Sequence, residues 1–101
     1  MTKLLVLYNT PADTAAFDRY YGETHIPIAN RIPRLRSYTV SKGSVTALAG
    51  TAPYLVAELT FDSMADLNAA LASPEGKAAA DDVPNFATGG VTLLTYDTKK
   101  V

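Results

Sequence analysis

The chain has 101 residues, 48% of them hydrophobic, and its nine basic and ten acidic residues leave a net charge of −1. This length supports one hydrophobic core, so we expect a single domain over residues 1–101, and the apolar content excludes a disordered chain. The dispersed basic residues argue against a nucleic-acid partner, the absence of cysteine excludes disulfides and thiol nucleophiles, and no apolar run reaches the ~20 residues that cross a bilayer.

The first half of the chain predicts a strand, a helix and a second strand. Residues 3–9 form an apolar run rich in leucine and valine, which is typical of a buried strand. Residues 13–22 show helical spacing of aromatic residues, and we expect Gly22 to interrupt this helix. Residues 24–31 predict one or two further turns, and the alternating residues 34–42 predict the second strand.

The second half of the chain predicts two more strands and two helices. Residues 43–52 are small and polar, as in a flexible hairpin loop, and residues 54–61 alternate as a third strand. Ser63 begins a capping box, which predicts a helix directly after it. A second short helix is expected over residues 73–82, and residues 89–98 close the chain as a fourth strand.

The order β-α-β-β-α-β predicts an α+β protein with a ferredoxin-like fold. In this fold the helices cover one face of a four-stranded antiparallel sheet, and the other face meets water or a partner. That second face is expected to hold Tyr54, Val56, Glu58 and one side of the last strand. These residues are too apolar to leave exposed, so we expect two copies to pair sheet against sheet as a homodimer.

The most informative stretch, residues 17–38, reads FDRYYGETHIPIANRIPRLRSY. It places the only histidine, His25, close to tyrosines and arginines, a combination typical of a small-molecule site. His25 is a candidate catalytic residue because imidazole can accept and donate a proton near neutral pH; alternatively, it caps the helix or packs under Pro27. Tyr38 is a candidate that donates a hydrogen bond to a carbonyl or enolate oxygen; alternatively, it fills the core.

Four further residues are candidates for binding a substrate. Side chains alternate along a strand, so Arg36 is expected on the same face as Tyr38. It can bind a carboxylate there, unless it is a surface arginine. Glu58 can orient the histidine, act as a second base or pair with an arginine across the interface, unless it is a solvated edge residue. Tyr21 and Tyr54 can line the pocket, although aromatic residues at regular spacing also serve packing.

The sequence offers no recognisable metal or cofactor site. One histidine among scattered carboxylates lacks the ligand spacing of a metal site, and Gly89-Gly90 is not a dinucleotide fingerprint. We therefore expect neither a metal nor a cofactor, with heme ligation by the histidine as the alternative.

Taken together, these features resemble the EthD family, named after the ethyl tert-butyl ether degradation protein, in the dimeric α+β barrel superfamily. The order of the elements agrees over nearly the whole chain. The residues that carry the resemblance are Phe17 and Tyr20, then His25-Ile26-Pro27, then Pro33, Arg36 and Tyr38.

The resemblance implies a homodimer whose two sheets form a barrel, with one pocket in each subunit. It also implies small-molecule chemistry, because similar proteins include lactone isomerases, cyclases and proteins attached to oxidative degradation pathways. Members of the family are often described as oxidoreductases, and the resemblance implies this description too. Similar muconolactone isomerases use a cysteine, which this chain lacks.

The leading hypothesis is a cofactor-independent acid/base enzyme acting on a small lactone, quinone or aromatic carbonyl compound. His25 moves a proton in this hypothesis, and Tyr38 polarises the substrate oxygen. The alternatives are a non-catalytic ligand-binding accessory protein of an oxygenase system, or a dimerisation module with a filled pocket. The opening residues lack the features of a signal peptide, so we expect a cytoplasmic protein without a membrane partner.

Overall fold

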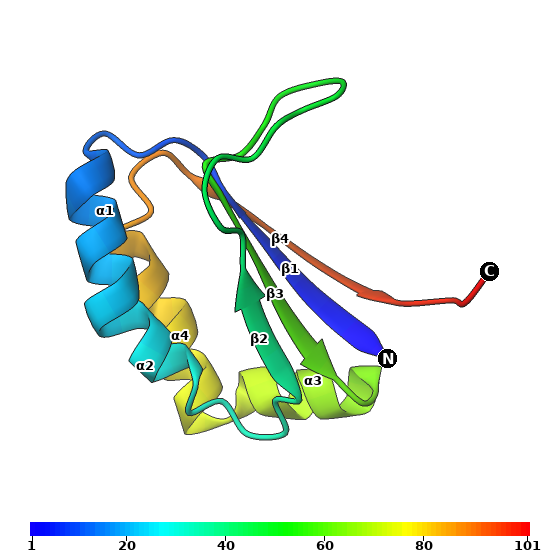
Figure 1. Cartoon of the computed structure of the whole chain (residues 1–101). Coiled ribbons are helices and arrows are strands. Elements are labelled where there is room, and N and C mark those ends of the chain that lie inside the picture. Colours follow the sequence, from blue (N-terminus) through cyan, green and yellow to red (C-terminus); the bar gives the residue numbers. More distant parts are fainter.

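The computed structural model describes all residues 1–101 and contains one antiparallel sheet with the helices on one side (Figure 1). The strands are β1 (Thr2–Tyr8), β2 (Ser37–Val40), β3 (Leu55–Phe61) and β4 (Val91–Asp97). They lie in the order β2-β3-β1-β4, and each neighbouring pair is antiparallel. The predicted α+β, ferredoxin-like fold with a four-stranded sheet is confirmed.

The helices form two segments that connect the strands. The first segment runs without a break through α1 (Thr14–Tyr20), a π-helical turn (Tyr21–His25) and α2 (Ile26–Ala29). The expected interruption at Gly22 is wrong, because this glycine lies inside the π-helical turn. The second segment contains α3 (Met64–Ala72), α4 (Pro74–Asp82) and a 3-10 turn (Val83–Asn85).

Side-chain caps fix where three of these helices begin. The Asp13 carboxylate accepts a hydrogen bond from the backbone of Ala16, and the Ser63 hydroxyl accepts one from Asp66, as the capping box predicts. The Ser73 hydroxyl caps α4 in the same way. None of the helices combines the length and the hydropathy needed to span a bilayer.

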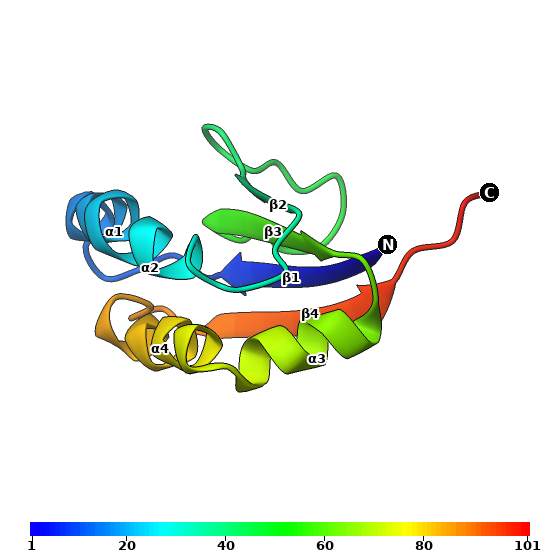
Figure 2. The ribbon, with the colours of Figure 1, turned by 90° about the horizontal axis from the view of Figure 1, so that it is seen from below.

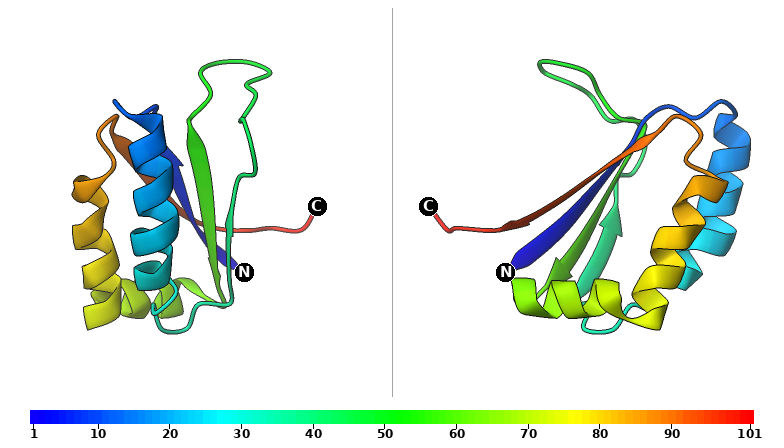
Figure 3. Two further views of the ribbon diagram at one scale, coloured as in Figure 1. Left: turned by 60° about the vertical axis from the view of Figure 1, so that its left-hand side comes forward. Right: turned by 180° about the vertical axis from the view of Figure 1, so that it is seen from behind.

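The helices are arranged so that they face the sheet as a separate layer. Helices α1 and α2 run beside α4, while α3 crosses near the ends of the strands (Figures 2 and 3). Residues from both layers form the core, and Phe61 and Leu67 are fully buried in it. Burying a side chain of this size contributes about 1.5–3 kcal/mol. The layer of helices is therefore held to the sheet by apolar packing.

The strand register separates an inner face, toward the helices, from an open face. Leu4 pairs with Leu59 and Val6 with Ala57, and all four side chains are buried. Tyr38 pairs with Leu59, which places it on the same inner face. The alternation of side chains along β1 thus gives every second residue of this strand to the core.

The open face carries apolar side chains around one ion pair. Lys3 Nζ lies 2.8 Å from Glu58 Oε1, and the apolar residues beside them are Leu5, Leu7, Val56, Leu94 and Tyr96. The loop at residues 43–53 and the C-terminal residues 98–101 both project on this side of the sheet (Figure 3). The open face therefore has the apolar character that the sequence predicts.

Strand β2 is shorter than predicted, because its first residues are not extended. Arg34 has a φ of 64°, in the left-handed region that strands do not use. The strand begins only at Ser37, so Arg34 and Arg36 both precede it.

Candidate active site

A cavity of about 340 Å³ lies between the inner face of the sheet and the helices. The strands contribute Leu4, Val6 and Leu59, and most of the other lining residues are also hydrophobic. The polar side chains at its wall are one histidine, three tyrosines and one threonine, which are His25, Tyr8, Tyr21, Tyr38 and Thr95. The predicted site residues His25, Tyr38 and Tyr21 thus meet at this cavity, on the face of the sheet opposite to the expected dimer surface.

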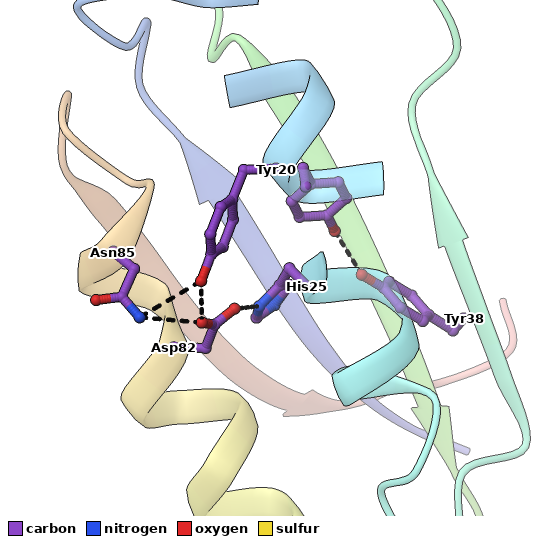
Figure 4. Close-up of polar contacts among 6 residues, drawn as sticks. Tyr20, His25, Tyr38, Asp82 and Asn85 are labelled. Atoms are coloured by element: carbon purple, nitrogen blue, oxygen red, sulfur yellow. Dashed lines mark hydrogen bonds and ion pairs between the residues drawn. The ribbon is translucent and has the colours of Figure 1, made fainter. Parts of the chain in front are cut away.

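His25 is held by a buried carboxylate at the end of α4. His25 Nδ1 lies 2.9 Å from Asp82 Oδ2, and both side chains are more than 90% buried (Figure 4). The second ring nitrogen, Nε2, makes no hydrogen bond within the chain. Since every fully buried side-chain nitrogen has a hydrogen-bond partner, Nε2 is not fully buried. Since His25 lines the cavity, Nε2 is the nitrogen that a ligand can reach.

Asp82 accepts three hydrogen bonds, which keep it ionised. The Tyr20 hydroxyl donates to Oδ1 at 2.6 Å, Asn85 Nδ2 donates to the same oxygen at 3.0 Å, and His25 Nδ1 contacts Oδ2 (Figure 4). Burial opposes ionisation, but these donors hold the pKa of Asp82 below its usual range. An ionised carboxylate only accepts hydrogen bonds, so the proton of this pair is on His25 Nδ1.

His25 is therefore a neutral base at physiological pH. Burial lowers the pKa of the imidazole below 6.5, and the hydrogen bond and charge of Asp82 oppose this shift only partly. With the proton on Nδ1, the Nε2 lone pair is free to accept a proton. The carboxylate behind the ring would stabilise the imidazolium that forms.

The π-helical turn places the rings of Tyr21 and His25 on one side of the helix. The backbone N–H of Ile26 donates to the carbonyl of Tyr21, five residues earlier, which defines this turn. The rings of Tyr21 and His25 then lie side by side with centroids 5.3 Å apart. Such turns are frequent at functional sites, and this one directs both side chains into the cavity.

Tyr21 and Tyr38 form a pair of hydroxyls at the cavity wall. Their oxygens are 2.5 Å apart, and Tyr21 comes from the π-helical turn while Tyr38 comes from β2. Figure 4 labels Tyr38 and marks this contact with a dashed line to the ring of its partner, which carries no label. Burial raises the pKa of both hydroxyls, so each keeps its proton at neutral pH. One hydroxyl donates to the other, and the second proton remains available for a ligand oxygen.

Three predicted substrate-binding residues lie away from this cavity. Arg36 donates two hydrogen bonds to Asp62, at 2.9 and 2.6 Å, on the surface. The expectation that Arg36 lies on the same strand face as Tyr38 is wrong, because Arg36 precedes the short strand β2 and is hydrogen-bonded to the carboxylate that follows β3. It lines a separate surface depression instead.

Glu58 and Tyr54 are also placed elsewhere. Glu58 is on the open face with Lys3, so the prediction that it orients the histidine is wrong, and Asp82 has that position. Tyr54 precedes β3 and was expected on the open face, but its ring packs against Phe17 with centroids 5.3 Å apart. Neither residue lines the cavity.

Asp82, Tyr20 and Asn85 are the polar residues that the sequence analysis missed as a group. A signal for the aspartate exists in the spacing of α4, where Gly76, Ala79 and Asp82 are all buried at intervals of three residues. A carboxylate in phase with the apolar side of a helix needs a partner. No three or more histidine, cysteine, aspartate and glutamate side chains gather in a manner that would hold a metal ion.

Comparison with known proteins identifies the family of the chain. The model of the EthD domain matches residues 9–90 of the chain, which include the histidine, both tyrosines of the pair and the buried aspartate. The chain belongs to the EthD family. A relative from Rhodococcus erythropolis, described as an uncharacterized 11.0 kDa protein in the thcB-thcC intergenic region, is 44% identical over 103 residues and covers 100% of this chain and 98% of its own.

Solved structures of similar proteins share the fold. An EthD family protein from Bacillus halodurans superposes with a TM-score of 0.88 at 34% identity, over 98% of this chain and 99% of its own. A dimeric ferredoxin-like protein of unknown function from Thermobifida fusca has a TM-score of 0.71 at 14% identity, over 96% of this chain and 90% of its own. The membership and the fold expected from the sequence are thus confirmed.

Proposed function

We propose that this EthD-family chain is an enzyme that moves protons on a small oxygenated compound without a cofactor. The observation that carries the proposal is the pair His25–Asp82, which presents an unpaired Nε2 to an apolar cavity. A ring or chain compound with an acidic C–H or O–H beside a carbonyl fits this arrangement. Lactones, quinol-type compounds and aromatic ketones belong to this class.

The proposed step begins when Nε2 removes a proton from the carbon next to the carbonyl. The C–H bond breaks, its electron pair moves into an enolate, and the negative charge develops on the substrate oxygen. The free hydroxyl proton of the Tyr21–Tyr38 pair donates a hydrogen bond to that oxygen. Returning the proton to another carbon gives an isomer, and Asp82 stabilises the imidazolium in between.

The burial of these groups supports this division of roles. A general base acts best when its pKa does not far exceed the working pH, and the lowered pKa of His25 keeps Nε2 unprotonated. The tyrosines, whose pKa values burial raises, keep their protons and act as donors. Positioned acid/base groups of this kind contribute about 10²–10⁴ in rate.

A binding role without catalysis is the second candidate, favoured by the apolar lining of the cavity. An accessory protein of an oxygenase system could hold a metabolite there. It would bind saturably without turning its ligand over, and His25→Gln would change affinity alone.

Deuterium uptake distinguishes these two functions. The ketone 2-tetralone has exchangeable protons beside its carbonyl, and their loss in D₂O is followed by ¹H NMR. We expect the wild-type chain to accelerate exchange above the buffer rate and His25→Gln to abolish the acceleration. Tyr54→Phe, outside the cavity, is the control that keeps it. Equal rates for the wild type and His25→Gln would contradict the enzymatic proposal.

We also propose that two copies pair through the open face of the sheet. Its apolar residues, two of which are Leu94 at 44% and Tyr96 at 40% exposure, surround the Lys3–Glu58 ion pair. The loop at residues 43–53 and the C-terminal end project on the same side, where a second copy would lie between them (Figure 3). Apolar patches of this kind mark association surfaces.

A further inference from the structure

The wall of the cavity carries no charged side chain. None of its 18 lining residues is lysine, arginine, aspartate or glutamate. Its four titratable groups are one imidazole and three phenols, from His25, Tyr8, Tyr21 and Tyr38. A ligand in this space therefore meets hydrogen-bonding groups but no counter-ion.

The four titratable groups are also uncharged at neutral pH. Burial raises the pKa of the three tyrosines, so they stay protonated, and it lowers the pKa of His25, so the ring stays neutral. The formal charge in contact with these four groups is the carboxylate of Asp82, which is hydrogen-bonded to Nδ1 of His25. Its negative charge repels an anion. Its three hydrogen bonds already stabilise that charge, so it does not require a cation.

The cations that could neutralise an anionic ligand are engaged outside the cavity. Arg34 pairs with Asp66, and Arg36 forms two hydrogen bonds with Asp62. Lys3 pairs with its partner on the open face. None of the remaining lysines and arginines lines the cavity.

We propose that this cavity selects uncharged ligands, namely small ring compounds with a hydroxyl, carbonyl or amide group, and rejects their carboxylate analogues. The inference rests on the proposed function, because the same cavity and the same histidine receive the ligand. A carboxylate that leaves water for an apolar wall without a counter-ion loses its hydration uncompensated. A neutral group loses less: its oxygen can accept a hydrogen bond from a tyrosine, and a hydroxyl or amide N–H can donate one to Nε2.

Two isosteric ligands test this selection directly. We choose 2-naphthamide and 2-naphthoate, which have the same shape and differ by a negative charge. Binding at pH 7.5 is followed through the Hε1 signal of His25, the only histidine in the chain. We expect 2-naphthamide to shift the signal saturably and 2-naphthoate to bind about 100-fold more weakly or worse. Equal dissociation constants, or no response to either ligand, would overturn the proposal.

A cation placed at the cavity should reverse the selection. Leu93 lines the cavity at 56% exposure, so Leu93→Arg puts a guanidinium at its edge with little cost to the core. We expect this variant to bind 2-naphthoate at least about tenfold more tightly than the wild type does, with 2-naphthamide unchanged. Thr95→Arg, at the next inner position of β4, is the second variant. If both variants fold and neither binds 2-naphthoate more tightly than the wild type does, the charge argument is overturned.

Two controls separate the cavity from the general charge of the protein. Leu48→Arg adds the same charge at a fully exposed position of the loop, and it should leave both affinities unchanged. Arg36→Gln should also leave them unchanged, because this arginine is bound to Asp62 on the surface. A fall in 2-naphthoate affinity in Arg36→Gln would overturn the proposal by showing that the arginine holds the carboxylate.

Failure of this inference can be told apart from failure of the proposed function. Loss of selectivity with intact deuterium exchange of 2-tetralone would refute the ligand class alone. Selective binding of 2-naphthamide without exchange would refute the role of His25 as a base and leave the ligand class standing.

Discussion

Asp82→Asn tests the proposed base without removing it. In the wild type, Oδ1 accepts from Tyr20 and Asn85, while Oδ2 faces His25 Nδ1. The asparagine keeps its oxygen where two donors point, so its NH₂ group faces the imidazole. An NH₂ group donates, which requires Nδ1 to become an acceptor and moves the ring proton to Nε2. The variant therefore presents the cavity with a donor where the wild type presents a base.

The size of the effect follows from this inversion. A ring with its proton on Nε2 cannot accept another there, so we expect exchange of 2-tetralone to lose the whole general-base contribution, about 10²–10⁴-fold. That range corresponds to about 2.7–5.5 kcal/mol of barrier. The variant exchanges one buried hydrogen-bonded group for another, so we expect its free energy of unfolding to fall by only about 1–3 kcal/mol.

Nitrogen-15 NMR reads the tautomer itself. Because the chain has a single histidine, its two ring nitrogens can be assigned without ambiguity from a histidine-labelled sample. We expect the proton on Nδ1 in the wild type and on Nε2 in Asp82→Asn. Asp81→Asn, the same change at the exposed neighbouring residue, is the matched control and should behave as the wild type. An Nδ1–H tautomer with unchanged exchange in Asp82→Asn would refute the reasoning.

The remaining predictions concern pH, the tyrosine pair and the dimer. Since burial lowers the pKa of His25, exchange should rise with pH below 6.5 and stay level above it, and an inflection above 6.5 would contradict the assignment. The unfolded chain binds a proton at pH values where the native histidine stays neutral, so thermal melts should show stability falling as pH drops below 6.5. Tyr38→Phe removes a donor and should lower kcat for exchange about 10²-fold, with Tyr96→Phe on the open face as the unchanged control. Leu94→Glu should convert a dimer into monomers in light scattering, while Ala65→Glu at an exposed position of α3 should not; a monomeric wild type would refute the pairing.

The fold is readable from the sequence because its signals are local. Alternation marks the strands, and the hydroxyl of Ser63 marks the start of α3 in both the sequence and the structure. The π-helical turn is not predicted from the sequence, because Gly22 suggests that the helix is interrupted, whereas the helical backbone continues through this residue. The positive φ of Arg34 likewise depends on how the chain turns into β2, which no local pattern encodes.

The site is only half readable, because its partners come from distant parts of the chain. His25 stands out as the one histidine, and its neighbours in sequence point to Tyr21 and Tyr38. Asp82 lies 57 residues away, and only the packing of α4 beside α2 brings it to the imidazole. Glu58 was expected on the open face, where the structure has it, but His25 lies at the cavity on the other face of the sheet, so Glu58 cannot be its carboxylate partner.

The central claim, that His25 is a neutral base open to the cavity, is tested most directly by an NMR titration of its ring with and without 2-naphthol. We predict a midpoint below 6.5, a proton on Nδ1, and a shift of the Nε2 signal when 2-naphthol donates its hydroxyl to that nitrogen. A midpoint at or above 6.5 together with an Nε2 signal that ignores the ligand would contradict the claim.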